Sequence, residues 1–131
     1  MTTTLSRWLI ALAALLLAAA TGLGAIASHG LAAVLDAAAL HSFETAVSYQ
    51  FIHSLGLIAI AIYGERHPTT RALSVAALLQ LAGIVLFCGG VYASSLDGPD
   101  WIAALAPTGG VSLIVGWLVV GFAALRQLSS K

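Results

Sequence analysis

The sequence predicts an all-α protein, an integral membrane four-helix bundle that forms one domain over residues 1–131. Hydrophobic residues make up 60% of the chain and charged residues only 8%, whereas soluble domains carry about 25% charged residues. Four apolar stretches each approach or exceed the roughly 20 residues that cross a bilayer as a helix. They are residues 8–27, 43–63, 72–96 and 102–125. Unbroken runs rich in Leu and Ala favour helices over the short alternating segments of a membrane barrel.

The first apolar stretch follows Arg7 and so resembles the start of a signal peptide. At residues 8–27 it is longer than the roughly 7–15 apolar residues of a signal peptide, and we expect it to remain as the first span. The connection after it, residues 28–42, places Leu31, Val34 and Leu35 near helical spacing. Either a short amphipathic helix at the membrane interface or an irregular loop fits this pattern.

Turn-forming residues separate the later spans. Residues 64–71 form a short polar connection between the second and third spans. The sequence Asp97-Gly98-Pro99-Asp100 is a strong turn signal before the fourth. Pro107 interrupts the last apolar stretch and is favoured in the first turn of a helix. We therefore expect the fourth span to cover residues 107–125, with residues 101–106 as a separate interfacial segment.

The basic residues predict how the protein is oriented. With four spans, the N-terminus, the second connection and the C-terminus lie on the same side of the membrane. All the basic residues are found there: Arg7, Arg66, Arg71, Arg126 and Lys131. The connections on the other side carry Asp36, Asp97 and Asp100. Because Lys and Arg concentrate in short cytoplasmic loops, both termini are expected in the cytoplasm.

Polar side chains gather on one face of the second predicted helix. At 100° per residue, a half-turn of the helix contains His41, Glu44, Thr45, Ser48, Tyr49 and His53. A face with so many hydrogen-bonding groups is expected to point toward other helices or a wet cavity rather than lipid. His53 lies near the middle of the membrane, and Gln50 is about one turn above it, on nearly the opposite side of the helix.

This polar intramembrane face, comprising Glu44, Ser48, Tyr49, Gln50 and His53, allows more than one interpretation. It fits a satisfied polar network that holds the helices together, because polar side chains commonly bond between membrane helices. That interpretation leads to a structural or accessory membrane component. It also fits a small transporter with a proton or solute pathway, because ionisable groups at membrane depth often mark such pathways.

A third interpretation is a metal or haem site near the outer surface, with His29, His41 and Glu44 as candidate ligands. His41 and Glu44 are three residues apart and share a helix face, and imidazole with carboxylate suits divalent metals. Their spacing matches no diagnostic metal motif, and we predict no cofactor.

Other functions find little support in the sequence. The chain has no G-x-S-x-G, P-loop or H-E-x-x-H motif, so enzymatic activity is not expected. A net charge of zero argues against nucleic acid as a partner. The single cysteine, Cys88, is expected to be a small core residue. The lipid bilayer is the partner that the composition implies, and other protein partners cannot be identified.

Small residues recur at four-residue spacing, as in Ala18/Gly22, Gly89/Ala93 and Ser112/Gly116. Such pairs let the backbones of membrane helices approach closely. We therefore expect the bundle to form a homo-oligomer through its Gly and Ala faces.

Three segments together resemble a known family. Residues 24–31 read Gly-Ala-Ile-Ala-Ser-His-Gly-Leu, residues 43–53 run from Phe-Glu-Thr-Ala to Tyr-Gln-Phe-Ile-His, and residues 107–111 read Pro-Thr-Gly-Gly-Val before Gly116-Trp117. They resemble the small membrane proteins of the domain of unknown function 423 family, also called the YgdD or transmembrane-protein-256-like family. The resemblance implies a four-span protein of the bacterial inner (plasma) membrane, but it supplies no activity.

The resemblance also singles out individual positions. The side chains that match family motifs are His29, Glu44, Tyr49, Gln50 and His53. The matching glycines are Gly30, Gly109, Gly110 and Gly116.

Overall fold

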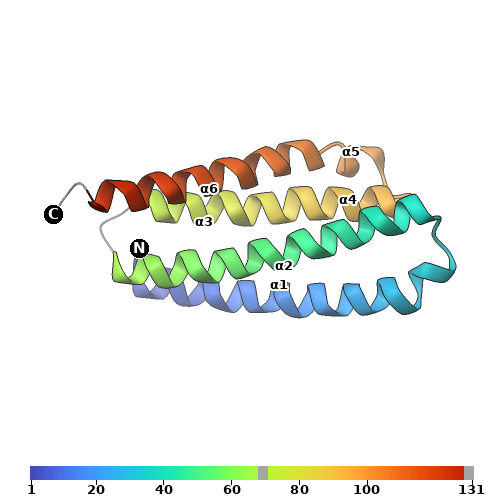
Figure 1. Cartoon of the computed structure of the whole chain (residues 1–131), viewed down its shortest axis with the longest axis horizontal. Coiled ribbons are helices and arrows are strands. Elements are labelled where there is room, and N and C mark those ends of the chain that lie inside the picture. The colour runs from blue at the N-terminus through green and yellow to red at the C-terminus, as the bar shows by residue number, and fades with distance from the viewer. Residues whose placement is uncertain (68–70, 129–131) are drawn as a thin grey trace.

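A computed structural model describes residues 1–67 and 71–128 of the chain, and in these residues it contains helices and turns but no strand. The prediction of an all-α membrane bundle is confirmed. Its four spans are long and apolar enough to cross a bilayer (Figure 1). They are α1 (Thr3–His29), α2 (Ala37–Arg66), the nearly continuous helix formed by α3 (Arg71–Gly83), η2 (Ile84–Cys88) and α4 (Gly89–Ser95), and α6 (Ala106–Leu128).

The connection between α1 and α2 is shorter than the sequence suggested. It contains one 3₁₀ turn, η1 (Leu31–Ala33), and no separate amphipathic helix. The side chain of Asp36 accepts hydrogen bonds from the backbone N–H groups of Ala38 and Ala39, at 2.9 and 2.8 Å. An aspartate in this position caps a helix N-terminus, so α2 begins at Ala37 instead of near residue 43.

The fourth span begins close to the predicted proline. The backbone at Asp97 is left-handed, with φ of 52°, and ends the third span. The short helix α5 (Asp100–Ala103) follows, and α6 then begins at Ala106, directly before Pro107. The segment between the third and fourth spans is therefore a separate helical turn. Residues 68–70 of the second connection, and Lys131, lie outside the described residues.

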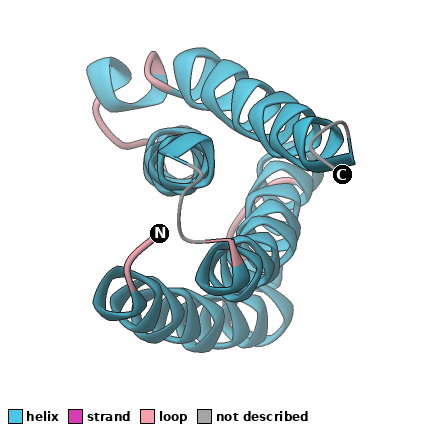
Figure 2. Cartoon of the chain, turned by 90° about the vertical axis from the view of Figure 1, so that its left-hand side faces the viewer, coloured by secondary structure: helices cyan, strands magenta, loops and turns pink. Residues whose placement is uncertain are grey.

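The spans pack in pairs along seven-residue repeats. α1 lies against α2, and α6 lies against α3 and η2 (Figures 1 and 2). The residues of α1 that face α2 or the core repeat every three or four positions: Ser6, Leu9, Ala13, Leu16, Ala20, Leu23 and Ala27. The corresponding residues of α6 are Gly109, Leu113, Gly116, Val120 and Ala123. A period of 3.5 residues produces left-handed packing, which is common in membrane bundles.

Small residues on these repeats bring two backbones into direct contact. A Cβ atom at Gly109 would meet the backbone nitrogen of Phe87 in η2. η2 is a π-helical segment, a local widening that is often found at functional sites. By contrast, a Cβ atom at Gly22 or at Gly89 would have no neighbour within 4 Å. Ala18/Gly22 therefore does not hold this bundle together, and self-association through such faces stays a prediction.

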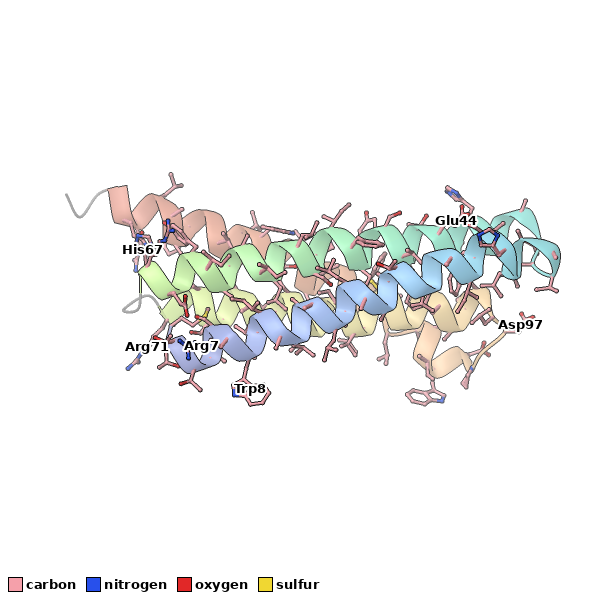
Figure 3. All side chains as sticks on the ribbon, turned by 90° about the horizontal axis from the view of Figure 1, so that it is seen from below. Arg7, Trp8, Glu44, His67, Arg71 and Asp97 are labelled. Carbon is pink, nitrogen blue, oxygen red and sulfur yellow. The ribbon has the colours of Figure 1, made fainter. Side chains whose placement is uncertain are left out.

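The two ends of the bundle differ in charge. Arg7, His67 and Arg71 lie at one end, and Glu44 and Asp97 lie at the other (Figure 3). The start of α1 and the end of α6 are also at the first end (Figure 1). Arg66 and Arg126, in the last turns of α2 and α6, belong to it as well. We call it the basic end and the opposite one the acidic end.

α2 is the central helix of the fold. Half of its most apolar window is buried, compared with only 17% of the corresponding window of α1. α2 packs against α1, α3, η2 and α4. Polar residues on α2 can therefore reach side chains of α1 and of the third span.

Candidate functional site

The middle of the bundle contains a hydrogen-bonded group that we call the His53 cluster: His53, Gln80, Trp117 and the carbonyl of Leu113. Gln80 Oε1 lies 2.9 Å from His53 Nδ1, and the indole N–H of Trp117 donates to the same nitrogen at 3.1 Å. Gln80 Nε2 donates to the Leu113 carbonyl at 3.3 Å. The cluster thus joins α2, the third span and α6.

The His53 ring has two alternative hydrogen-bonded forms. A neutral imidazole nitrogen carries either a proton or a lone pair, and indole is a donor only. When Nδ1 has its lone pair it accepts from Trp117, and when it carries the proton it donates to Gln80. The two neighbours therefore compete for one nitrogen, and either of them alone can satisfy it.

A second group, the Gln50 cluster, lies nearer the acidic end. The hydroxyl of Tyr92 donates to Gln50 Oε1 at 2.9 Å, and Gln50 Nε2 donates to the carbonyl of Leu16 at 2.8 Å. Gln50 is buried, and the Tyr92 ring packs on Phe43 with 4.8 Å between ring centroids. This cluster joins α2 to α1 and α4, so the two clusters together tie all four spans.

Two glycines make room for the His53 cluster. A Cβ atom at Gly56 would lie 2.7 Å from the Trp117 ring, and one at Gly116 would lie 3.1 Å from Gln80 Nε2. Trp117 can therefore lie directly on the backbone of α2, where its N–H reaches His53. Gly116 lets Gln80 pass close to α6 on its way to the Leu113 carbonyl.

The prediction that the polar half of α2 faces the interior is wrong for Glu44 and Ser48, which are exposed. Tyr49 is 42% exposed, but its ring packs on that of Phe87 in η2 with 4.9 Å between ring centroids, so it does contact another span. The hydroxyl of Ser48 donates to the carbonyl of Glu44 at 2.9 Å, within the same helix. A hydroxyl that bonds one turn back needs no partner from another helix. Hydroxyl residues can thus face outward in a membrane, and they were poor indicators of the buried face.

The buried face of α2 is instead the one centred on Gln50. It contains Phe43, Ala46, Val47, Gln50, His53, Ser54 and Leu57. Gln50 and His53 are thus the two members of the predicted polar face that the structure places in the core. Ser54 is fully buried, and its hydroxyl has no hydrogen-bond partner among the described residues, nor has that of Ser6 in α1.

The candidate metal ligands do not form a metal centre. Within residues 1–67 and 71–128, no group of three or more His, Cys, Asp or Glu side chains is placed to hold a metal ion. His29, His41 and Glu44 are all exposed near the acidic end. Cys88 is buried in the apolar core, as expected.

Sequence reasoning did not identify Gln80, Tyr92 and Trp117 as partners of the α2 residues. One signal was available for Gln80, because it is the lone amide within the apolar residues 72–96. Trp117 also lies in mid-span, away from the interfaces where membrane tryptophans are usually found. The helix that each of these residues faces depends on how the spans pair. Local sequence patterns do not predict that pairing.

The family model described as "Protein of unknown function (DUF423)" matches residues 23–110. The chain belongs to the DUF423 family. The matched region includes Gln50, His53, Gln80 and Tyr92, and it ends at Gly110, before Trp117. Gly109 and Gly110 begin the α6 contact with η2, where Gly109 meets the backbone of Phe87.

Several bacterial membrane proteins are similar to the chain over most of their length. The UPF0382 membrane protein YwdK of Bacillus subtilis is 35% identical over 83% of this chain and 89% of its own. A UPF0382 membrane protein of Haemophilus influenzae is 33% identical over 82% and 85%. The UPF0382 inner membrane protein YgdD of Escherichia coli is 30% identical over 92% of both chains. No solved structure matches the chain.

The Gln50 cluster gives a direct test of how this DUF423 protein is held together. We expect Gln50→Leu and Tyr92→Phe each to lower the free energy of unfolding in detergent by about 0.6–1.7 kcal/mol, because interhelical bonds in membranes are of this size. Since the two side chains share one bond, the double variant should cost less than the two single costs added. The measurement is a double-mutant cycle by denaturant titration.

The pair Gln50→Leu and Gln80→Leu is the matched control, because these amides belong to different clusters. Their costs should add. If the losses of unfolding free energy for Gln50→Leu and Tyr92→Phe also added, the bond between Gln50 and Tyr92 would not contribute to stability.

Proposed function

We propose that the protein is a non-catalytic structural or accessory component of the bacterial inner membrane. The observation that carries this proposal is that the amides of Gln50 and Gln80, His53 Nδ1 and the Trp117 indole are hydrogen-bonded to other spans, in the His53 and Gln50 clusters. Such bonds stabilise helix association in lipid. On this proposal the protein works without a cofactor, and its polar core serves the fold.

The core on the basic side of His53 supports the same proposal. It is an apolar cluster that extends across α1, α2, α3 and α6: Met1, Leu9, Ala13, Leu57, Ile60, Ala61, Leu73, Ala77 and Ala123. A proton or solute pathway needs polar groups or water along its whole length. The apolar cluster therefore favours a packed membrane component over the alternative of a transporter.

Flux through reconstituted protein tests this proposal. In proteoliposomes that carry a pH-sensitive dye, we expect proton leakage to match that of protein-free vesicles, both for the unmodified chain and for His53→Leu. The same His53→Leu sample should unfold at lower denaturant than the unmodified protein. Leakage that requires the protein and disappears in a folded His53→Leu variant would establish the pathway instead.

We also propose that both termini are cytoplasmic. Arginines at the basic end support this orientation because Lys and Arg remain inside in short loops. The name of the Escherichia coli relative, an inner membrane protein, supports the choice of membrane.

Cysteine labelling measures the orientation. In a Cys88→Ala background, an impermeant maleimide applied to spheroplasts should label Asp97→Cys and leave Glu65→Cys unlabelled until the membrane is broken. Glu65 lies in the last turn of α2 at the basic end, and Asp97 lies at the acidic end. The reverse pattern would overturn the proposed orientation.

A further inference from the structure

The outward face of α2 carries a seven-residue repeat that the other spans leave uncovered. Its positions follow the alternating steps of three and four residues that form the contact stripe between packed helices. They are His41, Thr45, Ser48, Ile52, Leu55, Ala59 and Ile62. All are exposed except Thr45, which is partly exposed. On the helical wheel the stripe lies directly opposite Gln50, the centre of the buried face. We call this stripe the α2 seam.

The α2 seam differs from the outward faces of the other spans because its acidic half is polar. Large exposed side chains on the other spans are apolar in mid-span, as at Leu15, Leu78 and Leu118. On α2, Glu44 flanks the seam and lies seven positions from the helix start at Ala37. No other charged residue in the part of the chain that the structure describes lies so far from a helix end.

The length of α2 places Glu44 just inside the hydrocarbon layer. The helix has 30 residues and is therefore about 45 Å long, whereas the layer is about 30 Å thick. A helix centred on the layer projects about 7–8 Å at each end, and Glu44 is about 10 Å from the start of α2. A charge at that depth is costly unless it is paired. The carboxylate of Glu44 has no hydrogen bond or ion pair within residues 1–67 and 71–128.

The hydroxyl of Tyr49 is a second unpaired group beside the seam. The Tyr49 ring packs on Phe87, but its hydroxyl makes no hydrogen bond within the described residues. Glu44 and Tyr49 are five positions apart and flank the seam on opposite sides. When two parallel helices pack along such a stripe, the flanking residue of one helix meets the opposite flanking residue of the other. A carboxylate and a phenol in these places are an acceptor and a donor.

We propose that the protein forms a parallel homodimer in which the α2 seams of two copies pack against each other. A twofold axis along the membrane normal brings equal depths of the two α2 helices together. The carboxylate of Glu44 then accepts a hydrogen bond from the hydroxyl of the partner's Tyr49, and the same bond forms on the other side of the axis. The seam also has β-branched Thr45 and Ile52 at one set of positions and Leu55 at the other, a pattern that favours two-stranded packing.

Disulfide cross-linking tests the position of the contact. In a Cys88→Ala protein in lipid vesicles, oxidation should convert Ser48→Cys to a covalent dimer, because the twofold axis places this residue of both copies at the contact. Thr21→Cys is the matched control. Thr21 is also an exposed hydroxyl residue that donates to a carbonyl of its own helix, and it lies on α1 within about one turn of Gly24, which faces Val47. It should remain monomeric at the same ratio of protein to lipid.

Dimer affinity tests the bond between Glu44 and Tyr49. Energy transfer between fluorescently labelled copies, followed as the protein is diluted with lipid, measures the dissociation constant. Glu44→Ala and Tyr49→Phe should each raise this constant about tenfold, because each substitution removes two interhelical bonds. Since both variants remove the same bonds, the double variant should weaken the dimer by less than the product of the two single effects. Glu65→Ala, at the other end of α2, should leave the constant unchanged.

Three outcomes would overturn the proposal. A protein that stays monomeric at every ratio of protein to lipid would exclude the dimer. Equal cross-linking of Ser48→Cys and Thr21→Cys would mean that copies meet only by random collision. A dissociation constant that neither Glu44→Ala nor Tyr49→Phe changes would mean that the α2 seam is not the contact. All these side chains lie on the outside of the bundle, so none of these outcomes would affect the proposed structural role of its core.

Discussion

A polar group in the hydrocarbon layer has no water to bond to, and the architecture of this protein follows from that constraint. The chain meets it in two ways. Hydroxyl groups such as those of Thr45 and Ser48 donate to carbonyls one turn back in their own helix. Amide and imidazole side chains bond less readily to carbonyls of their own helix. Gln50, His53 and Gln80 have their hydrogen-bond partners on other spans. The second group therefore determines which helices meet.

The same constraint explains why glycines occupy the contacts between these helices. Trp117 can donate to His53 only if its ring lies on the backbone of α2, and Gly56 leaves the space for it. Gln80 can reach Leu113 because Gly116 faces it without a side chain. The contact between Gly109 and Phe87 then holds the start of α6 against η2. The bonds select the helix pairs, and the small residues permit the short separations that the bonds require.

Much of the fold could be predicted from the sequence because the bilayer imposes length and hydropathy on each span. The four spans and the role of Pro107 follow from local patterns. The burial of Gln50 does not, because the helical wheel put Gln50 nearly opposite the predicted polar face, whereas the buried face of α2 is centred on it. The seven-residue repeat of Ser6, Ala13, Ala20 and Ala27 is also visible in the sequence, and it marks the buried face of α1.

The partners of His53 could not be predicted in the same way. A helical wheel treats all polar residues as equal, and it grouped His53 with Ser48, whose hydroxyl is satisfied within its own helix. A helical wheel also does not show which helices are neighbours. Gln80 reaches His53 because the third span lies between α2 and α6. The site depended on helix pairing, and pairing is a property of the whole chain.

The mid-span clusters hold the spans together only if they are dry and hydrogen-bonded, and hydrogen exchange at Trp117 tests this most directly. Trp101 is 69% exposed near the acidic end and provides the comparison within the same molecule. In detergent micelles transferred to D₂O, we expect the Trp117 indole proton to persist in NMR spectra long after that of Trp101 has exchanged. Equally fast exchange of the two protons would mean that water reaches His53, and it would contradict a dry, hydrogen-bonded core.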